Sequence, residues 1–203
     1  MKKLYILLLL AVASVSFGQT IYSENMGVPT ATTLIPAYAT GTAPATFQNG
    51  APIAYTGTGD VRISTQSNTY SGFSAGGNVF LTSTAGKYFQ IDGINTSAYA
   101  PANIQMSFGY LTATLTVQVI VEYSTNASAA TPTWSPITFT NNANTSWNLV
   151  SIPGGVLPAS STLSLRFTQP ATPGQIRLDD IKVFNYNPSC TLVLGTPTGV
   201  CDA

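Results

Sequence analysis

Apolar and polar residues alternate along several short stretches of this chain. In the clearest stretch, residues 115–123, Leu, Val and Tyr occupy the odd positions, while Thr, Gln, Ile and Glu occupy the even ones. Successive side chains of a β-strand point to opposite faces of a sheet, so this alternation predicts a strand that buries one face. Residues 104–108 and 163–168 repeat the pattern, and Phe89 and Ile91 continue it upstream.

Weaker strand candidates extend the pattern over most of the chain. They lie at residues 21–24, 61–65, 78–82, 134–140, 147–152 and 175–184. Clusters of Gly, Asn, Ser and Thr between them predict turns. Beyond residue 18, no stretch shows apolar residues at helical spacing between capping residues. About ten short strands predict an all-β fold, a two-sheet antiparallel β-sandwich of Greek-key or jelly-roll type.

Residues 28–57 have the weakest strand signal. Prolines at positions 29, 36, 44 and 52 break any long strand pairing there. We therefore expect a long loop across one end of the sandwich, in which Tyr38, Phe47 and Tyr55 supply side chains for packing.

The last strand candidate changes its apolar face part-way along. The apolar residues of 176–178 occupy even positions, whereas those of 181–183 occupy odd positions. The change falls at Asp179 and Asp180. The strand is therefore either covered on both faces or bulged at these two residues.

The first 18 residues are typical of a signal peptide. Two lysines precede an apolar run over residues 4–13, and small residues at positions 16 and 18 place the cleavage before Gln19. The apolar run is shorter than the roughly 20 residues that a membrane-spanning helix needs. We expect a secreted domain over residues 19–186, in an extracellular or cell-surface location, followed at 187–203 by a linker or the start of another module.

The cysteines, Cys190 and Cys201, both lie in this final stretch. In an oxidising compartment they could form a disulfide, and two free thiols are the alternative. Their spacing is not that of a zinc site or a redox CxxC motif.

The composition narrows the chemistry. Only 7% of the residues are charged and there is no histidine, which excludes histidine-based catalytic triads and imidazole-ligated zinc. Without Lys2 and Lys3, five basic residues stand against seven acidic ones, and a net charge of −2 argues against nucleic-acid binding. We expect no membrane insertion either. No GxSxG motif is present, and the carboxylates do not suggest a glycosidase pair, so we expect no catalysis.

Two motifs at the ends of the domain resemble a known family. Residues 21–26 (IYSENM) and 176–183 (IRLDDIKV) are similar to the first and last strands of galactose-binding-like jelly rolls. Residues 89–96 and 104–109 resemble the middle of the same module, and the likeness covers roughly 20–186. Many carbohydrate-binding modules have this fold, and such modules are often found at the N-terminus of secreted proteins that use type IX secretion. The resemblance implies a carbohydrate partner and further domains of a longer chain.

The resemblance also implies a structural calcium ion between the first and last strands. The matching ligands are Glu24 and Asp179, with Asp180 as a further candidate. Calcium takes six to eight oxygen ligands, which Thr, Asn and backbone carbonyls would complete. Adjacent carboxylates repel one another unless a cation or hydrogen-bond donors neutralise them. The alternatives are exposure to solvent or pairing with basic side chains: Arg166, Arg177 or Lys182.

Aromatic side chains beside turn residues are the candidates for ligand contact. Aromatic faces stack on sugar rings, and we select Tyr70, Phe73 and Tyr110 because Gly72 and Gly109 let a ligand approach the backbone. The alternative for each is packing in the core. The sequence thus predicts a non-catalytic secreted recognition module that binds glycan or another extracellular surface. The rival interpretation is a passive structural or adhesion spacer in a larger protein.

Overall fold

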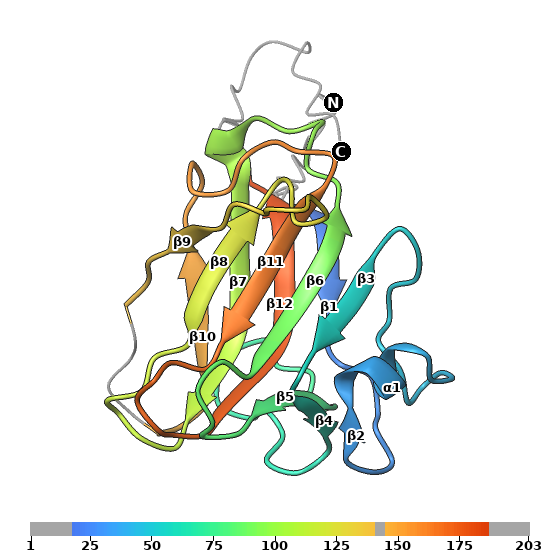
Figure 1. Ribbon diagram of the computed structural model, residues 1–203, viewed down its shortest axis with the longest axis vertical. Helices are drawn as coiled ribbons and strands as arrows, with labels where there is room; N and C mark the ends of the chain where they lie inside the picture. Colours follow the sequence, from blue (N-terminus) through green and yellow to red (C-terminus); the bar gives the residue numbers. More distant parts are fainter. Residues whose placement is uncertain (1–17, 141–144, 187–203) are drawn as a thin grey trace, which may run out of the picture.

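Two antiparallel sheets pack face to face in the computed structural model, which describes residues 18–140 and 145–186 (Figure 1). The arrangement confirms the predicted all-β sandwich. The apolar run of the leader, both cysteines and the expected linker at 187–203 lie outside the described residues.

The larger sheet has seven strands. Its order is β10 (Asn148–Ile152), β7 (Ile104–Thr112), β12 (Ile176–Asn185), β5 (Asn78–Leu81), β4 (Asp60–Arg62) and β2 (Thr33–Leu34), with β1 (Gln19–Glu24) also paired to β12. The smaller sheet has the order β3 (Ala54–Gly57), β6 (Tyr88–Ile94), β11 (Leu163–Thr168), β8 (Ile120–Ser124) and β9 (Ser135–Ile137). In Figure 1 the smaller sheet lies in front of the larger one.

Apolar side chains from the inner faces of both sheets fill the space between them. Phe167 of β11 is fully buried, 5.3 Å from Phe108 of β7 and 6.3 Å from Phe89 of β6 between ring centroids. The first of these contacts is edge-on and joins the two sheets, an arrangement that aromatic rings favour. The core thus fixes which face of each sheet points outward.

Strand β12 contains the bulge that the change of parity allowed. Its pairing with β7 shifts by one residue between Asp179 and Lys182, and Asp180 has a φ of 47°. Such a φ is uncommon outside glycine, and Asp is one of the residues that tolerate it best. The shift turns the apolar residues of both halves of β12 toward the core. β5 pairs with the first half of β12, and β1 pairs with the second half.

The clearest strand prediction was wrong at its start. β8 begins at Ile120, and Leu115 lies in a turn. The Tyr110 hydroxyl donates to the Val117 carbonyl at 2.9 Å and accepts from the Val119 N–H at 3.3 Å. A side chain therefore satisfies backbone groups that a neighbouring strand would otherwise pair, while Val117 and Val119 still point into the core.

The prediction of one long loop over residues 28–57 was also wrong. This segment contains β2, the short helix α1 (Ile35–Ala39) and β3. Tyr38, Phe47 and Tyr55 are buried, as expected, and Phe47 stacks on Tyr55 with ring centroids 4.1 Å apart. α1 is the longest helix of the described ranges, and none there is long and apolar enough to cross a membrane.

Replacing Tyr110 by Phe tests the hydroxyl that stands in for a strand partner. Tyr110→Phe leaves the buried Val117 carbonyl and Val119 N–H without this partner, and we expect it to lower the free energy of unfolding by about 1–3 kcal/mol. Tyr123→Phe is the matched control, because the hydroxyl of the half-buried Tyr123 makes no hydrogen bond to residues 18–140 or 145–186. Urea unfolding measures both, and an equal, small effect of the two substitutions would contradict the assignment.

Candidate functional site

The outer face of the larger sheet is covered where β12 and β7 meet. Residues 63–77, between β4 and β5, lie on it, and Tyr70 is only 9% exposed. A Cβ atom at Gly109 of β7 would lie 2.2 Å from the Tyr70 hydroxyl oxygen, so the tyrosine rests directly on the sheet. The indole N–H of Trp147, the residue before β10, donates to the Thr65 carbonyl of the same segment at 3.1 Å.

Two buried aspartates fasten this covering segment to the bulge of β12. The Ser67 hydroxyl donates to Asp179 Oδ2 at 2.7 Å. The Tyr70 hydroxyl and the Ser74 N–H donate to Asp180 Oδ2 at 2.5 and 3.0 Å. Neutral hydroxyl and backbone N–H groups, and not basic side chains, are therefore the hydrogen-bond partners of the two adjacent carboxylates.

Burial raises the pKa of Asp179 to about 8, and the neighbouring carboxylate of Asp180 adds to the rise. Hydrogen bonds from Ser67, Ser74 and the Asp180 N–H act in the opposite direction. Burial also raises the pKa of Tyr70, so its hydroxyl remains a donor. We call these two carboxylates and their donors, Ser67, Tyr70 and Ser74, the latch. The strength of the latch depends on the protonation of Asp179.

The rest of this face near the latch is filled by two arginines. The guanidinium carbons of Arg62 and Arg177 lie 3.7 and 4.7 Å from the ring centroid of Phe80. Arg177 donates to Asn78 Oδ1 at 2.7 Å and to the Ser64 carbonyl at 2.9 Å. Arg177 therefore holds the first residues of the covering segment and does not pair with the aspartates.

Glu24 belongs to a different network. Its carboxylate accepts hydrogen bonds from the Met26 and Gln48 N–H groups at 2.8 Å and from the Tyr55 hydroxyl at 2.6 Å. The Asn49 side-chain amide adds a fourth at 3.2 Å. These donors point their hydrogens at both carboxylate oxygens, which is the environment of a satisfied buried carboxylate.

The predicted calcium ligands are therefore not brought together. Glu24 faces Tyr55 of the opposite sheet, whereas Asp179 and Asp180 face residues 63–77 on the outer side. Within residues 18–140 and 145–186, no three acidic, cysteine or histidine side chains form a group that could hold a metal ion. The sequence placed the two ends of the domain side by side correctly, because Glu24 pairs with Ile181, but side-chain direction separates the carboxylates.

The three aromatic candidates also have different environments. Tyr110 is 1% exposed and makes the core hydrogen bonds described above, so it presents no face to a ligand. Tyr70 is buried in the latch. Phe73 is 43% exposed and contacts Tyr70 edge-on, with ring centroids 6.3 Å apart. Only Phe73 of the three has a surface that a ligand could stack on.

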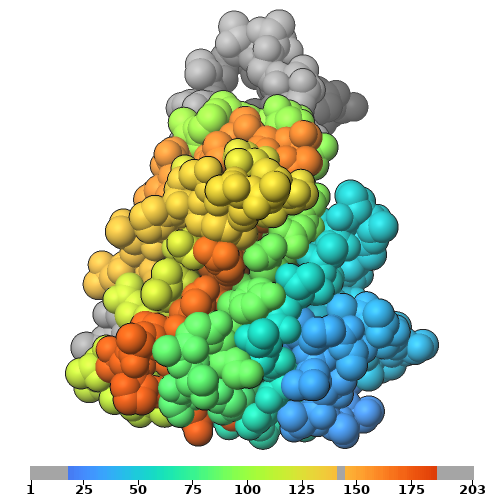
Figure 2. Space-filling model, viewed as in Figure 1, coloured from blue at the N-terminus to red at the C-terminus, as the bar shows by residue number. Residues whose placement is uncertain are grey.

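The outer face of the smaller sheet is open instead, and β6, β11 and β8 form its centre (Figure 2). Strand pairing aligns a row across all five strands, from Thr56 through Gln90, Arg166 and Glu122 to Pro136. Each of these residues alternates with a neighbour that points into the core, so the row faces outward. A sheet face of this kind presents its side chains on a rigid scaffold.

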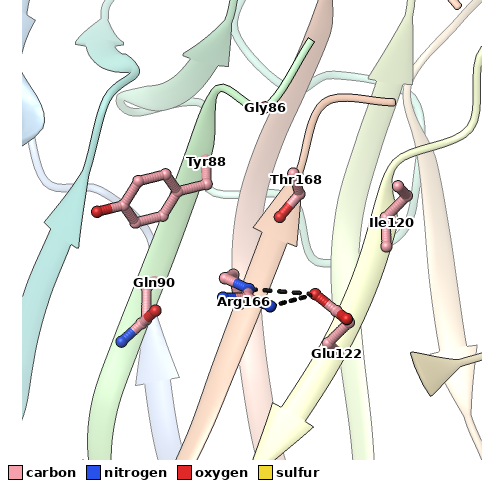
Figure 3. Close-up of a pocket in the computed structure, with 7 residues that line it drawn as sticks. All are labelled: Gly86, Tyr88, Gln90, Ile120, Glu122, Arg166 and Thr168. Atoms are coloured by element: carbon pink, nitrogen blue, oxygen red, sulfur yellow. Dashed lines mark hydrogen bonds and ion pairs between the residues drawn. The ribbon is translucent and has the colours of Figure 1, made fainter. Parts of the chain in front are cut away.

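Two hollows lie along this face and share Gln90. The first, of about 440 Å³, is lined by Gly86, Tyr88, Gln90, Ile120, Glu122, Arg166 and Thr168 (Figure 3). The second, of about 300 Å³, is lined by Pro52, Gln90, Asp92, Gly93, Ala127, Ser128, Thr162 and Ser164. We call the two hollows together the groove.

An ion pair organises the middle of the groove. Arg166 donates from Nε and Nη2 to Glu122 Oε2 at 3.1 and 2.8 Å, and Figure 3 shows the two side chains turned toward one another. The guanidinium carbon lies 3.9 Å from the ring centroid of Trp134. The contacts with Glu122 and Trp134 hold Arg166 in one orientation, so its guanidinium offers hydrogen-bond donors at fixed positions.

Sequence reasoning missed this groove. The residues selected from the sequence for ligand contact were Tyr70, Phe73 and Tyr110, and none of them lines the groove. The available signal was the presence of Asp92, Glu122 and Arg166 at outward positions in a chain with few charges. These charges indicate a common site only once β6, β11 and β8 are known to be neighbours. That pairing joins segments that are far apart in the sequence.

Comparison with known proteins gives similarities at the level of solved structures. No family model and no curated protein matches the chain. A C-terminal family 22 carbohydrate-binding module of Clostridium thermocellum Xyn10B shares 12% identity, with 84% of this chain and 96% of that chain covered and a TM-score of 0.48. A family 30 carbohydrate-binding module shares 15% identity, covering 90% and 94%, with a TM-score of 0.47. TmCBM61, solved with β-1,4-galactotriose, shares 12% identity, covering 66% and 89%, with a TM-score of 0.37.

These three structures are carbohydrate-binding modules. Identities of 12–15% and TM-scores below one half leave the function of this chain to be argued from its own residues.

The latch predicts a pH dependence of stability. The pKa of Asp179 is about 8 in the folded protein and about 3.9 in an unfolded chain, so its contribution to stability is complete below about pH 4 and is lost as the pH rises through 8. Asn cannot ionise and keeps an acceptor for the Asp180 N–H. We therefore expect Asp179→Asn to be more stable than the wild type at pH 9, with an advantage that shrinks toward pH 5.

Thermal unfolding between pH 5 and 9 measures this difference. Asp92→Asn, on the outer face of the other sheet, is the control and should show no comparable pH-dependent gain. A difference between Asp179→Asn and the wild type that stays constant with pH would contradict the raised pKa of Asp179.

Proposed function

We propose that this domain is a non-catalytic recognition module that binds glycan along the groove on the outer face of the smaller sheet. The observation that carries the proposal is the pair of adjoining hollows that share Gln90. Volumes of about 440 and 300 Å³ are in the range of small-molecule sites, and their succession along one face suits an elongated ligand.

The side chains of the groove match the chemistry of a sugar chain. Tyr88 is a partly exposed aromatic residue of the first hollow, and its face can pack against the apolar C–H faces of sugar rings. Gln90, Arg166 and Thr168 offer donors and acceptors for hydroxyl groups. A ligand with alternating apolar and hydroxyl surfaces fits this mixture better than an apolar or highly charged one.

The arrangement of carboxylates supports binding without catalysis. Hydrolysis of a glycosidic bond commonly uses two carboxyl groups, one of which must donate a proton. On this face Glu122 is held in the ion pair with Arg166, and the Asp92 carboxylate accepts from the Gln90 amide at 3.0 Å. Neither is placed as the proton donor of such a pair. We further propose that the module is secreted and works beside other domains of an extracellular or cell-surface protein.

The second candidate function is a passive structural or adhesion spacer. Two features support it, and neither requires a ligand: the outer face of the larger sheet is covered, and the first and last strands, β1 and β12, pair with one another. A spacer needs no groove, whereas a recognition module does. Binding measurements therefore distinguish the two candidates.

Tyr88→Ala tests the groove directly. A glycan array identifies a ligand, and calorimetry then measures its affinity for the wild type and the variant. We expect Tyr88→Ala to weaken binding by about 1–2 kcal/mol, roughly 5- to 30-fold, because a stacking face is lost. The melting temperature should change little, since Tyr88 is partly exposed.

Phe73→Ala is the matched control, because Phe73 is an exposed aromatic residue outside the groove. Its affinity should equal that of the wild type. If Phe73→Ala weakened binding and Tyr88→Ala did not, the ligand would lie on the covering segment and the groove assignment would be wrong. Absence of binding to every glycan would favour the spacer, and release of sugar from a bound glycan would contradict a non-catalytic role.

A further inference from the structure

The charges of the groove do not cancel. Three charged side chains line it: Asp92, Glu122 and Arg166. Glu122 and Arg166 form the ion pair at 2.8 Å, so their charges offset one another. Asp92 is left as the unbalanced charge.

No described cation neutralises Asp92. Both of its carboxylate oxygens lie 3.0 Å from the Gln90 amide nitrogen, which is a neutral donor. The ion pairs of residues 18–140 and 145–186 are Arg62 with Asp60 and Arg166 with Glu122. The other residues of the second hollow carry no charge, so this hollow presents one unpaired negative charge to a ligand.

The backbone fixes the position of this charge. The pairing of β6 with β11 shifts between Leu163 and Leu165, opposite Asp92 and Gly93. Gly93 has a φ of 88°, and a Cβ atom there would lie 2.3 Å from the Pro52 carbonyl oxygen, so the close approach of residue 52 requires glycine. Asp92 is therefore held at a bulge that forms one wall of the second hollow.

We propose that Asp92 is a specificity-determining residue that makes the groove select uncharged glycans over glycans that carry carboxylate or sulfate groups. The proposal rests on the proposed function of the groove. An anionic group about 6 Å from the Asp92 carboxylate is repelled by an amount equivalent to roughly a 3-fold loss of affinity with water-like screening and about 100-fold at a typical surface dielectric. The same carboxylate accepts hydrogen bonds from the hydroxyl groups of a neutral sugar.

Matched pairs of polysaccharides test this selectivity on the full chain. Each pair shares a backbone and differs in charge: methyl-esterified and de-esterified polygalacturonate, hydroxyethyl and carboxymethyl cellulose, and unsubstituted and glucuronic-acid-substituted xylan. Affinity electrophoresis measures binding of the wild type, Asp92→Asn and Ser151→Lys. Ser151→Lys is the control, because it changes the net charge by the same +1 at an exposed position on the other sheet.

We expect the wild type to bind the neutral member of at least one pair at least 3-fold more tightly than the charged member. Asp92→Asn should narrow that ratio at least 3-fold by strengthening binding of the charged member, and Ser151→Lys should not. High salt should narrow the ratio for the wild type but not for Asp92→Asn. The melting temperature of Asp92→Asn should match that of the wild type.

The outcomes separate the selectivity from the proposed function. Equal binding of both members, tighter binding of the charged member, or an unchanged ratio in Asp92→Asn would overturn the selectivity while glycan binding stands. An equal effect of Ser151→Lys would assign the selectivity to net charge and overturn the role of Asp92. Failure of the wild type to bind any member of the panel or of the glycan array would overturn both proposals.

Discussion

Strand β12 has to pair with β7 along its length and with β5 and β1 in succession, while both of its halves keep apolar side chains in the core. The extra residue at Asp179 and Asp180 reconciles these demands, because it reverses the parity of the strand half-way. The same bulge places two carboxylates where Ser67, Tyr70 and Ser74 can donate to them. The pairing of the central strand and the covering of one sheet therefore depend on a single local feature.

That covering gives the two outer faces different properties. On the larger sheet, residues 63–77 and the arginines on Phe80 occupy the surface near the bulge. On the smaller sheet, the outward side chains of β6, β11 and β8 stay open and form the groove. The charges follow the same division: Asp179 and Asp180 are buried beneath neutral donors, whereas Asp92 and the pair of Arg166 and Glu122 line the open face.

Alternation along the sequence predicted the fold because core-facing positions are a local property of each strand. The change of parity at Asp179 even located the bulge as one of two possibilities. Side-chain hydrogen bonds across the fold were not predictable in this way. The Tyr110 hydroxyl bonds the Val117 carbonyl in place of a neighbouring strand, and the Tyr55 hydroxyl donates to Glu24, which lies apart from the aspartates. The groove escaped prediction for the same reason, since it depends on which strands are neighbours.

We propose above all that ligand binds the open face of the smaller sheet and leaves the covering segment, residues 63–77, unaffected. Backbone amide chemical shifts, followed by NMR during titration with a glycan that the array identifies, test it most directly. We expect shifts concentrated at Gln90, Glu122, Arg166 and Thr168, with residues 67–74 unchanged. Shifts concentrated at residues 67–74, with none along β6, β11 and β8, would contradict it.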